Sequence, residues 1–142
     1  MRDLAIIFST LADTTRLEML ALLLRNDELC VCDFVEALGI SQSKASRHLR
    51  YMWNARLLED RRAGLWVYYR VSRSMDAERQ KLIKALGRVF EERDLTELDA
   101  KLADWLNRKP CATACAVEPA RKTPTRASAK TNKPRPAAEA RR

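Results

Sequence analysis

Apolar residues recur at helical spacing along most of the first 110 residues of the chain. Residues 1–12 are largely apolar and predict a first helix. Asp13 can cap a second helix, which ends near the polar run 26–28. The inward stripe predicted for this second helix consists of Leu17, Leu20, Leu23 and Leu24.

Two further helices are predicted on either side of a tight turn. A short helix spans residues 31–38, Gly39 suits the left-handed position after it, and Ile40 supplies the apolar residue that often follows. Ser41 then caps a helix that runs to about residue 54. Helix, glycine-containing turn and helix together form the pattern typical of a helix-turn-helix.

Alternating polarity follows over residues 57–71, where two candidate strands flank Arg62–Gly64. They predict a hairpin with a basic tip, a wing. Helical spacing returns over residues 76–107, and Thr96 with Asp99 resembles a capping box that starts a second helix there. The predicted fold is mainly α with a small β-hairpin: a dimeric winged helix-turn-helix, part of whose apolar surface serves the dimer interface.

The last part of the chain differs in composition. Residues 111–142 contain no aromatic residue, four prolines, eight lysines and arginines, and two glutamates, so this tail carries +6 of the net charge of +8. Such a segment buries too little apolar area to offset its ordering entropy. We therefore predict a folded domain over 1–108 and a basic, disordered tail over 109–142. The tail either adds salt-dependent affinity for DNA or only solubilises the protein.

The sequence contains no apolar run long enough to cross a membrane and no signal-peptide pattern. This indicates a cytoplasmic protein, where thiols stay reduced. Four cysteines in that compartment indicate ligands, redox groups or core residues rather than a disulfide framework. Paired catalytic carboxylates, a glycine-rich phosphate loop and a Ser–His pair are not recognisable, so we do not expect an enzyme.

The second helix of a helix-turn-helix lies in the major groove of DNA, with its N-terminal residues at the base edges. Gln can pair with adenine, Arg with guanine, and Ser with either. Lys44 and Arg50 suit phosphates, as do Arg61 and Arg62 of the predicted wing tip. His48 contacts a phosphate, packs at a helix end or reads a base. The predicted DNA-binding set is Ser41, Gln42, Ser43, Lys44, Ser46, Arg47, His48, Arg50, Arg61 and Arg62.

Three segments in order resemble one known family. Residues 11–20 (LADTTRLEML) resemble its opening motif, residues 28–33 (ELCVCD) its metal motif, and residues 41–49 (SQSKASRHL) its recognition helix. Over roughly residues 1–106 the chain is similar to the ArsR–SmtB family, in the branch of arsenical-resistance repressors. The resemblance implies a homodimer that pairs through its first and last helices and binds a palindromic double-stranded operator. It further implies that DNA is released when trivalent arsenic or antimony binds Cys30 and Cys32, with no other cofactor required.

Many members of this branch carry a third cysteine where this chain has Val35. A third ligand therefore comes from elsewhere: Cys111 or Cys115, water or a small thiol. Alternatively, two sulfurs suffice, and Cys111 and Cys115 form a separate site or have no role.

The spacing of Cys30 and Cys32 suggests a mechanism. Thiolates are the soft donors that trivalent arsenic and antimony prefer. Residues two apart in a regular helix do not face each other, so both sulfurs are expected to share an ion only if the first turn of helix 31–38 unwinds. For the same reason we do not expect both to be buried. The hypothesis is that this distortion passes through Gly39 and Ile40 and misplaces Ser41 and Gln42.

Two alternative functions remain open. One is a repressor of the same fold that senses oxidants or sulfide through a disulfide of Cys30 with Cys32 or Cys111. The other is a thiol–disulfide enzyme, although the strand-then-helix setting usual for such a site is not recognisable here.

Overall fold

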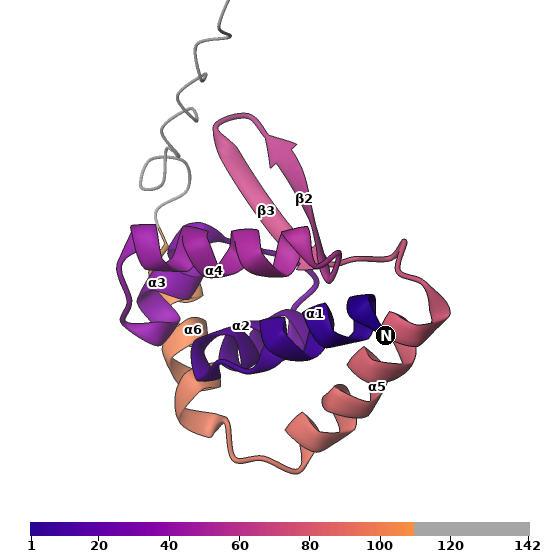
Figure 1. The fold of residues 1–142 in the computed structure, drawn as a ribbon. Coiled ribbons are helices and arrows are strands. Elements are labelled where there is room, and N and C mark those ends of the chain that lie inside the picture. The colour runs from indigo at the N-terminus through magenta and orange to yellow at the C-terminus, as the bar shows by residue number, and fades with distance from the viewer. Residues whose placement is uncertain (110–142) are drawn as a thin grey trace, which may run out of the picture.

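The computed structural model describes residues 1–109. Six helices and a three-stranded antiparallel sheet make up this part of the chain (Figure 1). The elements are α1 (Arg2–Leu11), α2 (Thr14–Arg25), β1 (Leu29–Cys30), α3 (Val31–Leu38), α4 (Gln42–Asn54), β2 (Leu58–Ala63), β3 (Trp66–Val71), α5 (Ala77–Glu91) and α6 (Thr96–Arg108). This order confirms the predicted winged helix-turn-helix. The calls on residues 110–142 lie outside the described residues, so the boundary near residue 108 stays a prediction.

Local capping explains where the early helices begin and end. The Asp13 carboxylate accepts a hydrogen bond from the Arg16 amide at 3.0 Å and caps α2. The Ser41 hydroxyl accepts from the Lys44 amide at 3.2 Å and caps α4. Gly39 adopts φ 61° between α3 and α4, where a side chain would be strained. The predicted cap at Asp13 is thus confirmed, and so is the predicted turn of the helix-turn-helix at Gly39 and Ser41.

The core surrounds α2 on several sides. Leu20 and Leu23 are buried as predicted, but Leu22 is also fully buried and Leu24 is exposed. The stripe prediction was partly wrong because α2 contacts α1, α3, α4, α5 and β3, so its buried residues are not confined to one face.

The sheet contains one strand more than predicted. Its order is β1–β3–β2, and Cys30 of β1 lies opposite Tyr68 of β3. The wing turn lies at Gly64 and Leu65, with Gly64 at φ 63°, rather than at Arg62–Gly64. Arg61 and Arg62 are therefore strand residues of β2, and their prediction as the wing tip was wrong.

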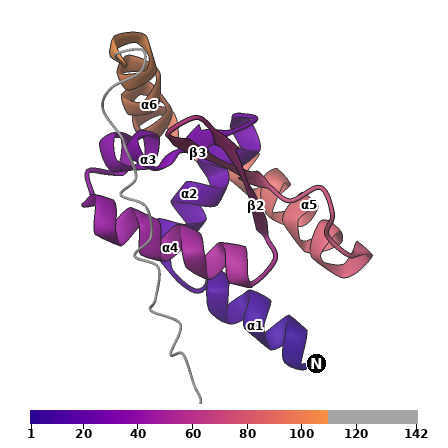
Figure 2. The same cartoon turned by 90° about the horizontal axis from the view of Figure 1, so that it is seen from above.

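The last two helices take different positions. α6 packs beside α3, whereas α5 lies on the other side of α2 (Figure 2). The residue before the first turn of α6 is Leu95, and Thr96 is its first helical residue. The predicted capping box of Thr96 with Asp99 is therefore wrong; Asp94 accepts from the Thr96 amide instead, at 3.1 Å. Among residues 1–109, no helix has the length and apolar character required of a membrane span.

Candidate DNA-binding surface and thiol site

The outer face of α4 carries most of the predicted DNA-reading residues. Ser41, Gln42, Ser43, Lys44, Arg47 and Arg50 are exposed, and Ser46 is half-buried. Leu49 and Met52 are fully buried and anchor the opposite face in the core. The α4 helix therefore presents polar side chains outward from a fixed position, which is what reading base edges in a groove requires.

His48 does not lie on that outer face. Its side chain is buried, with Nδ1 3.5 Å from Arg16 Nη1 and 3.7 Å from Asp13 Oδ1. Burial lowers the pKa of His48, although the negative charge of Asp13 opposes the shift. Of the roles proposed for His48, the structure fits helix-end packing, against the cap of α2. Its contact with DNA stays a prediction.

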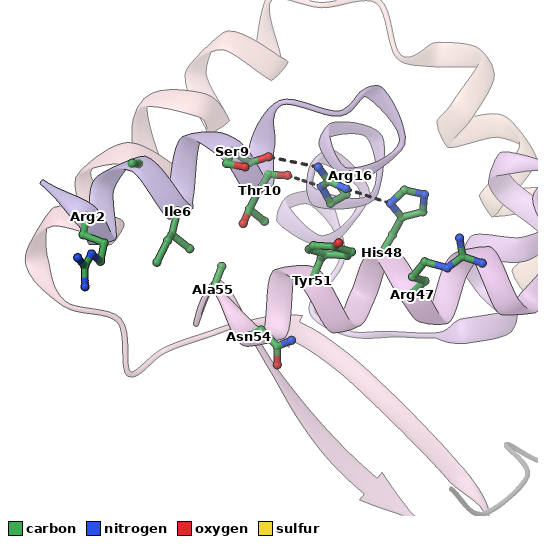
Figure 3. A pocket seen from close by; sticks show the side chains of 11 residues that line it. Arg2, Ile6, Ser9, Thr10, Arg16, Arg47, His48, Tyr51, Asn54 and Ala55 are labelled. Carbon is green, nitrogen blue, oxygen red and sulfur yellow. Dashed lines mark hydrogen bonds between the residues drawn. The ribbon is translucent and has the colours of Figure 1, made fainter. Parts of the chain in front are cut away.

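Arg16 connects α1, α2 and α4 at one end of an open groove of about 950 Å³ (Figure 3). Its guanidinium donates to the carbonyls of Ser9 (3.3 Å) and Thr10. It also lies 5.2 Å from the ring centroid of Tyr51 on α4, a favourable cation–π geometry. Arg16 thus helps fix the orientation of α4, a role that the sequence pattern did not reveal.

Two of the basic residues of the wing, Arg61 and Arg70, form ion pairs with glutamates. Arg61 forms a two-pronged ion pair with Glu28, with Arg61 Nε 3.1 Å from Glu28 Oε2, and its guanidinium lies 5.2 Å from the centroid of Tyr68. This hydrogen-bonded pairing holds the pKa of Glu28 below its usual value. Arg70 pairs with Glu59 across β2 and β3. Arg62 is exposed and has no ion pair within residues 1–109.

Cys30 and Cys32 lie where β1 meets α3. Cys30 is the capping residue before α3, with extended backbone (φ −90°, ψ 171°), and Cys32 is in the first helical turn. Their sulfur atoms are 3.0 Å apart, and both residues are buried, at 1% and 4% exposure. The expectation that the two would not both be buried was wrong, whereas the expectation that the first turn unwinds when an ion binds stays a prediction. Cys30 is outside the helix, so the sulfurs converge and sink into the core while the first turn of α3 stays intact.

Cys30 carries a free thiol, and residues from α6 complete its surroundings. The buried carboxylate of Asp33 accepts from the Cys30 amide (2.8 Å), from Trp105 Nε1 (2.9 Å) and from Lys109 Nζ (2.8 Å). Lys109 Nζ also lies 3.2 Å from Cys30 Sγ. Sequence reasoning missed Trp105 and Lys109 because they are more than 70 residues from Asp33 along the chain. No local pattern connects them.

The electrostatics of this site favour a protonated Cys30. Burial raises the pKa of the Cys30 thiol and the charge of Asp33 adds to the effect, while the Asp33 amide and Lys109 oppose it. Burial alone would lower the pKa of Lys109, but its hydrogen bonds to Asp33 and Cys30 give a net rise, so the amine stays charged. Within residues 1–109, no three His, Cys, Asp or Glu side chains gather as a metal site. Cys111 and Cys115 lie outside the described residues.

Comparison with known proteins places this architecture in a family. Residues 13–60 match the family described as "Bacterial regulatory protein, arsR family". The chain is 41% identical over 112 residues to the arsenic resistance transcriptional regulator ArsR1 of Pseudomonas putida, covering 78% of this chain and 86% of that protein. It is 45% identical over 87 residues to the arsenical resistance operon repressor of Escherichia coli, covering 61% and 74%.

A solved structure shows the same fold. The homodimeric winged helix-turn-helix DNA-binding domain of Mb0332 from Mycobacterium bovis is 28% identical, with a TM-score of 0.54, over 66% of this chain and 82% of that one. These likenesses agree with the resemblance seen in the sequence, and they exclude the thiol–disulfide enzyme. The chain therefore belongs to the arsR family of bacterial regulatory proteins and is a DNA-binding transcriptional regulator, not an enzyme.

Proposed function

We propose that this protein is a cytoplasmic transcriptional repressor that binds a palindromic operator as a homodimer and releases it when trivalent arsenic or antimony binds Cys30 and Cys32. The observation that carries the proposal is the pair of sulfurs 3.0 Å apart at the start of α3. A tight turn joins the other end of α3 to α4. The names of the P. putida and E. coli relatives, which refer to arsenic resistance, support the choice of inducer.

The donor set fits a soft ion. Thiolate bonds to a metal such as zinc are about 2.3 Å long, so two sulfurs 3.0 Å apart can both reach one ion without unwinding α3. Sulfur is the donor that soft metals and metalloids prefer. In reduced form, Cys30 and Cys32 would hold the metalloid. Each sulfur–arsenic bond would replace an arsenic–oxygen bond of arsenite, and the thiol proton would leave with that oxygen as water.

Cys111 and Cys115, which lie outside the described residues, are the candidates for a third sulfur. Lys109 Nζ lies 3.2 Å from Cys30 Sγ, which brings the end of α6 to the thiol pair. Covalent geometry keeps the Cα of Cys111, two residues later, within about 7.6 Å of the Cα of Lys109. We therefore propose Cys111 as the third ligand ahead of Cys115, for which the same limit is about 23 Å.

The dimer proposal rests on an exposed apolar surface. Phe8 of α1 and Val89 of α5 are 56% and 46% exposed. They line an apolar groove with Leu11, Leu17, Leu82 and Leu86. The apolar side of α6 packs against α3 of the same chain, and its Leu102 is buried there. We propose that α1 and α5, rather than α1 and the last helix, form the interface.

The test is a release titration. The purified full chain selects its operator from random duplexes, and operator affinity is then measured against arsenite, antimonite, zinc and cadmium. Native protein is expected to release DNA with the two metalloids, and Cys30→Ser and Cys32→Ser to retain it. Cys111→Ser is expected to need more arsenite than Cys115→Ser. Release of Cys30→Ser by arsenite as readily as native protein would contradict the proposal.

Mass spectrometry of the released protein separates the redox alternative. A bound metalloid supports the proposal, whereas loss of two hydrogens without bound metalloid indicates a disulfide switch.

Sedimentation of native protein and of Val89→Glu tests the interface: the native chain is expected to be dimeric and the variant monomeric.

A further inference from the structure

Lys109 contacts Cys30 and the wing at the same time. Its ammonium lies 3.2 Å from Cys30 Sγ and 2.8 Å from the Asp33 carboxylate. On the wing it lies 5.4 Å and 5.9 Å from the ring centroids of Trp66 and Tyr68 in β3, where an aromatic ring attracts a cation. A single charge at the end of α6 is therefore shared by Cys30, Asp33 and β3.

Two more connections join the same segment to the wing. Cys30 lies opposite Tyr68 in the β1–β3 ladder. Glu28, two residues before Cys30, holds Arg61 of β2, whose guanidinium lies over Tyr68 as well. Tyr68 is thus in contact with Arg61, Lys109 and the strand that carries Cys30.

The path from the thiols to α4 is longer. The sulfurs lie at the N-terminal end of α3, and the turn to α4 lies at its other end. Gly39 and Ile40 both donate their amides to the Val35 carbonyl, which closes the end of α3 as a rigid unit. A change at Cys30 reaches β3 by direct contact, whereas along the chain Ser41 is separated from Cys30 by the whole of α3.

We propose that Lys109 is a positioning residue that couples the Cys30–Cys32 pair to the wing, so that inducer binding moves the wing rather than α4. The inference rests on the function proposed above. When Cys30 Sγ serves as a ligand, the ion takes the place of the thiol proton and would set a positive centre beside the Lys109 ammonium, which it would repel. Lys109 then shifts relative to Trp66 and Tyr68, and β3 loses a fixed contact. An inducer changes DNA affinity only through such a difference between the two states.

The test compares Lys109→Met, Lys109→Arg and the control Lys101→Met. Lys101 is on the same helix and carries the same charge, but it pairs with exposed Glu97. Three quantities are measured on the full chain: arsenite affinity of the free protein, operator affinity without arsenite, and the ratio of operator affinities without and with saturating arsenite. Allosteric couplings typically span about 5–150-fold.

We expect Lys109→Met still to bind arsenite, with an affinity shifted by the loss of its contact with Cys30, while its affinity ratio falls by about tenfold. Lys109→Arg is expected to retain part of the ratio and Lys101→Met all of it. A native ratio in Lys109→Met would overturn the inference, and so would loss of arsenite binding, since Lys109 would then act on the ligand site itself.

Cys30→Ser separates this inference from the proposed function. If Cys30→Ser still releases DNA with arsenite, the proposed function fails regardless of Lys109. If Cys30→Ser retains DNA in arsenite but Lys109→Met releases it as native protein does, the inference fails and the proposed function stands. If Lys109→Met does not fold, tryptophan fluorescence gives a second readout. Arsenite should change the emission of native protein more than that of Trp66→Phe, because Trp66 contributes to the change. An identical change in both proteins would overturn the inference.

Discussion

Recognition helix α4 and the wing carry their positive charges in different settings. Lys44, Arg47 and Arg50 of α4 are exposed and have no ion pair within residues 1–109. In the wing, Arg61 and Arg70 are each paired with a glutamate, Glu28 and Glu59. The basic side chains of α4 therefore lack an ion-pair partner within residues 1–109, whereas Arg61 would have to leave Glu28 before it could pair with a phosphate.

The two elements also differ in their attachment. α4 is fixed by buried Leu49 and Met52 and by the contact of Arg16 with Tyr51. β3 of the wing is half-buried along its whole length and shares Lys109 with the thiol pair. This difference suggests a division of labour in which α4 supplies specificity and the wing supplies an affinity that the thiol site can change.

The largest effect is expected from α4. Arg47→Ala should weaken operator binding by about 1–3 kcal/mol, or roughly fivefold to 150-fold, because a two-pronged contact to guanine would be lost. Binding to a scrambled duplex should change much less. Equal losses on both duplexes would show that Arg47 contacts only phosphate, and the specificity assigned to α4 would have to lie elsewhere.

A smaller and uniform loss is expected from the wing. Arg62→Ala should weaken binding to operator and scrambled duplex alike and reduce the slope of log affinity against log salt by about 1, since one phosphate contact is removed. Salt titrations of both duplexes measure this. A change of preference among operator variants would indicate instead that the wing reads bases.

An increase in affinity is expected when the restraint on the wing is removed. Glu28→Gln breaks the ion pair with Arg61 and should steepen the salt slope by about 1, because Arg61 becomes available to a phosphate. Glu36→Gln is the matched control, since it removes an exposed carboxylate from α3 without touching the wing. If the two variants behave alike, the ion pair does not restrain Arg61.

The smallest effect concerns the anchoring of α4. Burial lowers the pKa of His48 in the folded protein, so the unfolded chain takes up a proton more readily as pH falls through about 6.5. Stability should therefore decline between pH 7.5 and 5.5, and less so in His48→Gln. Urea midpoints at both pH values measure this. An equal decline in the variant would show that His48 does not titrate in this range.

Features encoded by neighbouring residues were predictable from the sequence. Asp13 and Ser41 cap helices through amides three positions away, and Gly39 takes the conformation that the turn requires. The burial of His48 was also within reach, because Ala45, His48, Leu49 and Met52 follow the i, i+3, i+4, i+7 spacing of one helix face. Its polar character diverted the prediction to DNA.

Features that depend on distant residues were not predictable. Strand β1 exists because Leu29 and Cys30 pair with β3, about 40 residues later. That pairing sets Cys30 outside α3 and brings its sulfur to Cys32. Trp105 and Lys109 reach Asp33 only because α6 folds back onto α3. The motif at residues 28–33 therefore identified Cys30 and Cys32 in the sequence. The distance between their sulfurs and the residues around them depend on the tertiary structure.

Amide hydrogen exchange of the free protein, with and without arsenite, tests most directly whether the thiol pair acts on the wing. Arsenite is expected to speed exchange across the strands Leu58–Ala63 and Trp66–Val71 while leaving Gln42–Asn54 unchanged. Faster exchange in the first turn of α4 with an unchanged wing would contradict the account.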